Sequence, residues 1–309
     1  MTDLMLDTFR NIPVIPSFGN NDVFPHNQMS DKDTDLLDFY TTLWNHWIPA
    51  DQRATFNQGG YFTLRLPQLY IISLNTMFFY NKNKAIHNCE HLNSPAFGQL
   101  IWFENQLKMA QSDNSKVYVI GHIPPSPRDY KGTCLSQYMQ VVARYTDVIQ
   151  GHFFAHLNMD HFLIYDAKRQ EDLTINRDIE AYTDWLYGMY QSLAHTQAEP
   201  SWVVIQVSPS VLPVYYPTFR IYRYQINDTE NDNQLLGYSQ YYSNLTYWND
   251  HDHLEYELEY TTEDQYQMQD LTADSYFKLA KSMVTQNDLW SLYREHMVIK
   301  TKNFTDYDE

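Results

Sequence analysis

Basic residues are scarce in this sequence, and their scarcity limits the partners that the protein can bind. Lysine and arginine together number 21 against 38 aspartates and glutamates, so the formal net charge is −17 over 309 residues. A surface this acidic repels nucleic acid and anionic membranes. We therefore expect no nucleic-acid partner, and a polyanionic substrate would need bound cations or a local basic patch.

Long apolar runs and a secretory leader are also lacking. No stretch of the sequence is long enough to cross a bilayer as a helix. The first residues, Met1 to Asp7, include two acids and lack both the basic start and the apolar core of a signal peptide. The chain itself thus shows no membrane segment and no targeting signal.

Cysteine is nearly absent, because only Cys89 and Cys134 occur. Two buried free thiols are typical of a cytosolic protein, whereas a disulfide suits a luminal or secreted one. Three N-glycosylation sequons, which begin at Asn227, Asn244 and Asn303, favour the luminal alternative. The residues alone leave both states of the cysteine pair open.

What the sequence does contain is the apolar content of a folded protein, with 43% hydrophobic and 16% aromatic residues. Strand-like and helix-like segments alternate up to about residue 166, which predicts an α/β fold built in layers. The expected strands cover residues 12–15, 70–74, 117–120, 162–165, 202–207 and 219–224, and the expected helices cover residues 3–10, 34–48, 95–110, 136–147 and 275–297.

Shifts in composition predict two regions. Residues 1–225 are expected to form one domain, in which the polar segment 166–200 is a surface insertion. Residues 226–309 are acidic and tyrosine-rich, which predicts a C-terminal extension that ends in a helix.

Three loops each follow an apolar strand and place a small residue directly before a metal-capable side chain. They are Gly19-Asn20-Asn21-Asp22, Gly121-His122 and Ala155-His156-Leu157-Asn158. Because loops beyond the carboxyl ends of strands converge on one ligand site in α/β sheets, we expect these side chains to meet. Imidazole nitrogen and amide oxygen suit zinc, manganese or iron. Each histidine alone has a structural role as its alternative, and the order of the three loops carries the prediction.

This order resembles the calcineurin-like metallophosphoesterase superfamily, whose later motifs read Gly-Asn-His-Asp/Glu, Gly-His and Gly-His-x-His. The segments Ile120 to Pro125 and Phe153 to His156 are similar to the acid-sphingomyelinase branch, and Ile15 to Asn27 looks most like fungal vacuolar endopolyphosphatases. The resemblance implies a layered α/β/β/α sandwich with a helical C-terminal tail. It also implies a dinuclear site for divalent ions, which could be Mn, Mg, Co or Zn.

Particular residues receive roles through this resemblance. The implied metal ligands are Asn20, His122, His156 and Asn158, the last at a position where the family has histidine. Asn21 stands at the catalytic position of the family's proton-donating histidine, although a neutral amide cannot be a general acid. Asp22 and Asp160 would lie around the ligands, and Cys89 and Cys134 are a candidate disulfide.

The family's first motifs, Asp-x-His and Gly-Asp, do not occur in the nineteen residues before Asn20. We therefore expect the chain to be the C-terminal portion of a longer enzyme, with a sandwich that is incomplete at its N-terminal side. The bridging carboxylate of a two-metal site would be missing. Inactivity of the chain alone is one outcome that the resemblance allows.

The implied activity is metal-dependent cleavage of phosphoanhydride bonds within inorganic polyphosphate. The implied place is the vacuole lumen or the luminal side of the vacuolar membrane, to which the full-length family protein is anchored. One alternative is a sphingomyelinase-like phosphodiesterase, against which Asn21 argues because that type carries histidine there. Another is a non-catalytic remnant or binding module that retains His122 and His156 for structural reasons.

Overall fold

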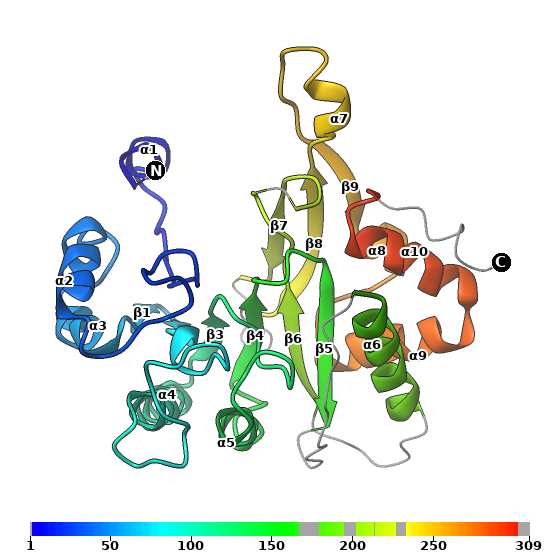
Figure 1. The fold of residues 1–309 in the computed structure, drawn as a ribbon. Coiled ribbons are helices and arrows are strands. Elements are labelled where there is room, and N and C mark those ends of the chain that lie inside the picture. The colour runs from blue at the N-terminus through cyan, green and yellow to red at the C-terminus, as the bar shows by residue number, and fades with distance from the viewer. Residues whose placement is uncertain (1, 167–178, 195–201, 213, 227–232, 302–309) are drawn as a thin grey trace. The chain divides into compact units, whose positions relative to one another are not determined.

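The computed structural model describes residues 2–166, 179–194, 202–212, 214–226 and 233–301 (Figure 1). The chain divides into two compact units, Met1–Ile149 and Gln150–Glu309. Each unit contains both strands and helices, and the C-terminal region is rich in helix. The predicted α/β class with a helical C-terminal region is confirmed.

Three strands of the first unit pair in the order β1-β2-β3. They are β1 (Phe62–Leu66), β2 (Leu69–Ser73) and β3 (Lys116–Ile120). β1 runs antiparallel to β2, whereas β2 and β3 are parallel, with Ser73 opposite Ile120. The loops that follow β2 and β3 therefore leave the same edge of the sheet. A hydrogen bond of 2.8 Å from the Ile123 N–H to the Thr76 Oγ1 joins these two loops.

Helices of the first unit flank these strands. They are α1 (Thr2–Thr8), α2 (Thr34–Leu43), α3 (Arg53–Gly59), α4 (Pro95–Ser112) and α5 (Gly132–Val142), with short 3-10 turns at Ala50–Gln52 and Thr76–Phe78. α4 begins as predicted, because the Ser94 side chain accepts the Ala96 N–H and proline follows the cap. Its buried face carries Leu100, Phe103 and Leu107, which pack toward β2 and β3. This burial stabilises the helix more than the helix propensity of its sequence does.

The predicted strand at residues 12–15 is wrong, because this segment has no regular structure. Pro13 and Pro16 lack the N–H groups that a ladder requires. The segment is held instead by the Ser73 hydroxyl, which donates to the Pro16 carbonyl at 2.7 Å. The helix expected over residues 34–48 ends at Leu43.

The strands in the described part of the second unit are β4 (Ile149–Phe154), β5 (His161–Asp166), β6 (Trp202–Val207), β7 (Thr218–Tyr224), β8 (Leu235–Tyr242) and β9 (Glu257–Thr261). β6 pairs in parallel with β4 and antiparallel with β5, which contains the strand predicted at residues 162–165. β7, β8 and β9 form a separate antiparallel sheet. The division predicted at residue 225 falls between β7 and β8, which pair with each other.

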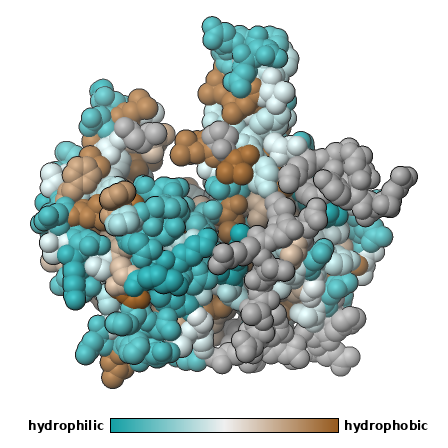
Figure 2. Space-filling view, viewed as in Figure 1, coloured by the Kyte–Doolittle hydropathy of each residue, from teal (hydrophilic) through white to brown (hydrophobic). Residues whose placement is uncertain are grey.

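The β7–β9 sheet has one polar and aromatic inner face and one apolar outer face. Side chains of β7 alternate, so Phe219 and Ile221 are exposed while Arg220 points inward. Phe219 stacks on Tyr241 of β8, with ring centroids 5.1 Å apart. Leu258 of β9 is also exposed. Figure 2 shows hydrophobic atoms at the surface of this region.

The helices of the second unit are α6 (Ile179–Ala194), α7 (Leu245–Trp248), α8 (Thr262–Tyr266), α9 (Ala273–Thr285) and α10 (Asn287–Met297). α6 packs on α9 and β5 and buries Leu186 and Tyr190 completely (Figure 1). α6 is the described part of the predicted 166–200 insertion, since residues 167–178 and 195–200 lie outside the described ranges. The helix predicted over 275–297 is two helices, because Gln286 adopts an extended backbone between them. None of the described helices is long and apolar enough to span a membrane.

Candidate metal centre

Asn20 lies on a tight loop that is anchored by the buried ring of Phe18. This ring packs edge-on against Tyr40 at 4.7 Å and stacks on Phe56 at 5.8 Å, and none of it is exposed. The next residue, Gly19, donates its N–H to the Asp22 carboxylate at 2.8 Å. Asp22 therefore shapes the turn that presents Asn20, which is itself buried, with 8% of its surface exposed.

His122 meets Asn20 at the carboxyl end of β3. Its Nε2 lies 2.8 Å from the Asn20 Oδ1, although 102 residues separate them in sequence. Gly19 packs directly on the ring: a Cβ at this position would lie 3.2 Å from both Cγ and Nδ1 of His122. The small residue before Asn20 thus allows the backbone to approach the imidazole.

The environment of His122 keeps its imidazole neutral. Burial lowers the pKa of His122 to about 4. A neutral ring can offer a nitrogen lone pair to a metal ion at mildly acidic and neutral pH, whereas an imidazolium cannot.

The Asn20–His122 pair fits a divalent ion. Two ligand atoms that each lie about 2.1 Å from one ion are separated by about 3 Å. The Asn20 Oδ1 and the His122 Nε2 are 2.8 Å apart. One amide oxygen and one imidazole nitrogen suit zinc or manganese. Within the described residues, no three His, Cys, Asp or Glu side chains gather as a metal cluster, so further ligands would include amide groups or come from another loop.

His156 and Asn158 lie in the second unit, on the loop between β4 and β5. Both residues have a left-handed backbone, with φ of 71° and 58°, and the Leu157 N–H bonds to the Ala155 carbonyl at 2.8 Å. Asparagine tolerates this conformation better than most residues. Both side chains are partly buried. The meeting of this pair with Asn20 and His122 stays a prediction.

Asp160 and the neighbouring His161 have defined structural partners. The Asp160 carboxylate forms a buried ion pair with Arg220 of β7 and accepts a hydrogen bond from the Tyr260 hydroxyl of β9. His161 bonds through Nε2 to the Tyr182 hydroxyl of α6 at 2.8 Å. These contacts tie the end of the His156 loop to the β7–β9 sheet and to α6.

Asn21 is exposed beside Asn20. Its amide can donate a hydrogen bond to a phosphoryl oxygen, but it cannot deliver a proton. Its catalytic position stays a prediction.

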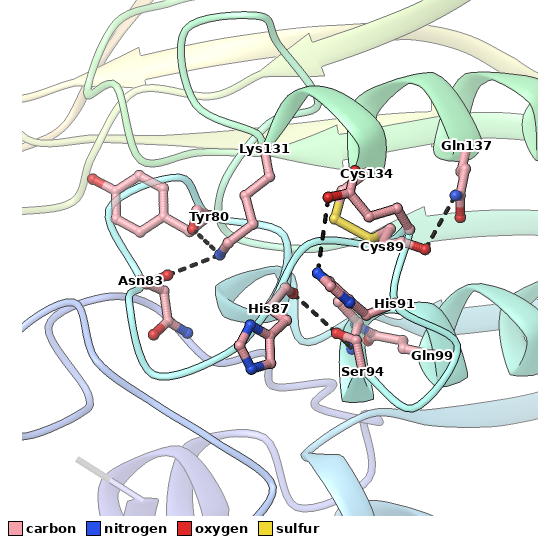
Figure 3. Close-up of a disulfide and its surroundings, with 12 residues drawn as sticks. Tyr80, Asn83, His87, Cys89, His91, Ser94, Gln99, Lys131, Cys134 and Gln137 are labelled. Carbon is pink, nitrogen blue, oxygen red and sulfur yellow. Dashed lines mark hydrogen bonds and ion pairs between the residues drawn. A yellow bond between two sulfur atoms is a disulfide. The ribbon is translucent and has the colours of Figure 1, made fainter.

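Cys89 and Cys134 form a disulfide (Figure 3). The bond links the loop before α4 to α5 and encloses β3 and the Gly121-His122 loop. Polar contacts surround it: the Gln137 amide donates to the Cys89 carbonyl at 3.1 Å. Lys131, directly before α5, donates to the carbonyls of Tyr80 and Asn83.

Of the three sequons, only the one that begins at Asn244 lies in the described ranges. Asn244 caps α7, where its Oδ1 accepts the Tyr247 N–H at 3.1 Å. The side chain is partly exposed. Asn227 and Asn303 lie outside the described residues.

Several polar residues that lie beside Asn20 or Asp160 were not predicted from the sequence. Asn27 contacts the Asn20 amide from seven residues away, and the motif Ile15 to Asn27 contains it without showing its role. Arg220 and Glu259 are buried together with Asp160 in the second unit. The burial of Glu259 could not be predicted from the sequence, because it depends on a β-bulge that leaves no residue of β8 directly opposite Glu259.

Comparison with known proteins agrees with the sequence motifs. A family model described as the acid sphingomyelin phosphodiesterase C-terminal region matches residues 198–307, which run from the residues before β6 into the C-terminal end. An endopolyphosphatase from Cryptococcus neoformans is 31% identical over 270 residues, which are 75% of this chain and 40% of that protein. Another from Schizosaccharomyces pombe is 27% identical over 250 residues, which are 75% of this chain and 43% of that protein.

A third relative extends the similarity over nearly the whole chain. Sphingomyelin phosphodiesterase A of Dictyostelium discoideum is 30% identical over 306 residues, which are 96% of this chain and 46% of that protein. The chain thus spans less than half of the length of each of these relatives. All three relatives carry the names of hydrolases. The resemblance predicted from the motifs is confirmed: the chain is related to the acid-sphingomyelinase-like branch of metallophosphoesterases and resembles its endopolyphosphatases.

Proposed function

We propose that this protein takes part in metal-dependent hydrolysis of phosphoanhydride bonds within inorganic polyphosphate. The observation that supports this most is the pair of donor atoms, Asn20 Oδ1 and His122 Nε2, 2.8 Å apart at the end of β3. Relatives named endopolyphosphatase support the substrate class.

Each ligand residue would contribute a donor of known type. Asn20 would offer its amide oxygen and His122 its neutral imidazole, while His156 and Asn158 would complete the centre from the loop after β4. A bound divalent ion, which could be Mn, Mg, Co or Zn, would lower the pKa of a coordinated water and offset phosphate charge. Asn21 would hydrogen-bond a phosphoryl oxygen of the substrate.

Charge makes cations necessary for this substrate. The chain has a formal net charge of −17, which opposes the approach of a polyanion. Cations held at the Asn20–His122 pair would reverse the field at the site while leaving the rest of the surface acidic. We therefore expect substrate affinity to depend on divalent metal.

We also propose a luminal location, in the vacuole or at the luminal side of its membrane. The Cys89–Cys134 disulfide suits an oxidising compartment. The Asn244 sequon lies at a partly exposed position, as glycosylation requires.

A second candidate is a sphingomyelinase-like phosphodiesterase. The match over 96% of this chain to the Dictyostelium sphingomyelin phosphodiesterase favours it. Asn21 argues for the phosphoanhydride reaction, because the leaving group of a polyphosphate is a stable phosphate that needs little protonation.

A substrate comparison distinguishes the two candidates. The full chain is incubated with polyphosphate or with sphingomyelin in micelles, with each of the four divalent ions. We expect polyphosphate to be cut to intermediate lengths, with loss of this activity in His122→Ala and retention in His91→Ala, a change at the surface. Release of phosphocholine without shortening of polyphosphate would replace our proposal with the second candidate. Activity on neither substrate would contradict both candidates for this chain alone and would favour the non-catalytic alternative.

A further inference from the structure

The side-chain amide of Asn20 can serve a metal ion in only one of its two orientations. The carbonyl oxygen can bind a metal ion, whereas the NH2 group is a hydrogen-bond donor that has no available lone pair for a metal ion. A rotation of the amide by half a turn exchanges the two with little change in shape. Something must therefore hold Oδ1 toward His122.

Two neighbouring side chains hold the NH2 group of Asn20. Its Nδ2 donates to the Asn27 Oδ1 at 3.1 Å and lies 3.0 Å from the His26 Nε2. The Asn27 Oδ1 accepts one of the two hydrogens of this NH2 group, whereas the His26 ring faces two amide donors, because its Nδ1 also lies 3.1 Å from the Asn27 Nδ2. A neutral imidazole accepts at only one nitrogen, so Asn27 is the main acceptor for the Asn20 amide and His26 assists when its Nε2 is unprotonated. With both hydrogens directed to this side, Oδ1 faces the His122 Nε2.

The backbone keeps Asn27 in place for this role. The Asn27 N–H bonds to the Asn20 carbonyl at 3.3 Å, so the loop closes on itself at the same pair of residues. Asn27 has a left-handed backbone, with φ of 67°. This conformation favours asparagine or glycine, and of these two only asparagine also supplies a side-chain oxygen.

We infer that Asn27, assisted by His26, is a positioning residue that orients the Asn20 amide so that its oxygen faces the metal position. The inference rests on the metal centre of the proposed function. It gives a role to Asn27, which is not itself one of the proposed ligands. In the metal-free protein, His122 then carries its proton on Nε2 and donates it to the Asn20 Oδ1.

The tautomer of His122 gives a test that needs neither substrate nor metal. Long-range proton–nitrogen NMR of histidine-labelled protein distinguishes a ring protonated at Nε2 from one protonated at Nδ1, and His122→Gln assigns the signal. We expect the Nε2–H form in the wild type. A ring protonated at Nδ1 would overturn the inference.

Substitutions at Asn27 separate orientation from backbone strain. Asn27→Gly removes the acceptor but accepts the left-handed backbone, and Asn27→Asp keeps an acceptor oxygen. We expect Asn27→Gly, and more strongly Asn27→Gly with His26→Ala, to give a mixture of His122 tautomers and to weaken Mn²⁺ or Zn²⁺ binding by about 10-fold or more. Asn27→Asp should keep the wild-type His122 tautomer, and the surface change His91→Ala should leave both the tautomer and the metal affinity unchanged.

Calorimetry with Mn²⁺ or Zn²⁺ and the NMR spectra decide the outcome together. An unchanged tautomer and unchanged metal affinity in the double variant would overturn the positioning role. Failure of the proposed function would show differently, as a wild type with the expected tautomer that does not shorten polyphosphate.

Discussion

Gly19 controls how closely the Asn20 loop approaches His122. A Cβ at residue 19 would lie 3.2 Å from two atoms of the His122 ring and 3.2 Å from the Asp22 carboxylate. These distances are shorter than ordinary van der Waals contact, so an added methyl group would displace the ring or the turn.

Gly19→Ala should therefore weaken the metal centre more than the fold. We expect a loss of about 10-fold in Mn²⁺ or Zn²⁺ affinity by calorimetry, as for other changes around metal ligands. Gly98→Ala is the control, because Gly98 lies in α4 and its added Cβ would meet nothing within 4 Å. Equal metal affinity in the two alanine variants would show that the close approach at Gly19 is unimportant.

A second residue-scale feature is the buried acid Glu259. A β-bulge turns it inward beside Tyr260, and 7% of its surface is exposed. Asp160, Arg220 and Lys300 act on it electrostatically, and neither carboxyl oxygen has a hydrogen-bond partner among the described residues. Burial, followed by the negative charge of Asp160, raises the pKa of Glu259 to about 8.

This raised pKa predicts that stability falls as pH rises. The folded state keeps the Glu259 proton up to about pH 8, while the unfolded chain releases it near its ordinary pKa of about 4.3. Between these values the folded state binds more protons, so the free energy of unfolding decreases with pH and levels off above pH 8. Glu259→Gln removes this charge, and we expect its thermal midpoint to exceed that of the wild type at pH 8.5 but to equal it near pH 4.5.

The matched control for this prediction is Glu257→Gln, an exposed position on the same strand. Thermal unfolding followed by circular dichroism at several pH values provides the measurement. A difference between Glu259→Gln and wild type that is independent of pH would show that Glu259 stays ionised in the fold.

At the scale of elements, the disulfide joins α5 to the loop before α4. The bond closes a loop with a sequence separation of 45 residues, which contains α4, β3 and His122. Cross-linking of this kind restricts the unfolded chain more than the folded one.

Replacing both cysteines by alanine should lower the free energy of unfolding by about 4 kcal/mol on the chain-entropy estimate for a loop of this length. Urea unfolding of the wild type under reducing conditions should approach that of the double variant. Oxidised and reduced wild type that unfold at the same urea concentration would contradict a stabilising role for the bond.

Many elements were predictable from local pattern. Ser94 and the proline after it marked the start of α4, and the apolar run at residues 117–120 marked β3. The prediction of a strand at residues 12–15 failed because the apolar residues of this segment are typical of a strand, whereas its prolines exclude strand pairing. The break at Gln286 was not predicted, because the apolar spacing of α9 continues into α10 and no proline or glycine lies between them.

At the scale of the whole molecule, part of the candidate site could be predicted because its motifs are short, although only His122 follows a strand of the first unit and Asn20 follows a segment without regular structure. Asn20 and His122 meet as expected from loops at one edge of the first unit's strands. Asn27 and Arg220 could not be assigned from the residues alone, since their roles depend on contacts with Asn20 and Asp160 that only the folded chain creates. The two-unit division also depends on packing that no compositional boundary marks.

The proposal on which the metal centre depends is that Asn20 and His122 bind one divalent ion between them. Anomalous X-ray diffraction from crystals of the full chain grown with Mn²⁺ or Zn²⁺ can locate such an ion. We predict an anomalous peak about 2.0–2.3 Å from both the Asn20 Oδ1 and the His122 Nε2. Crystals that contain the metal but show no peak between these two atoms would refute the proposal.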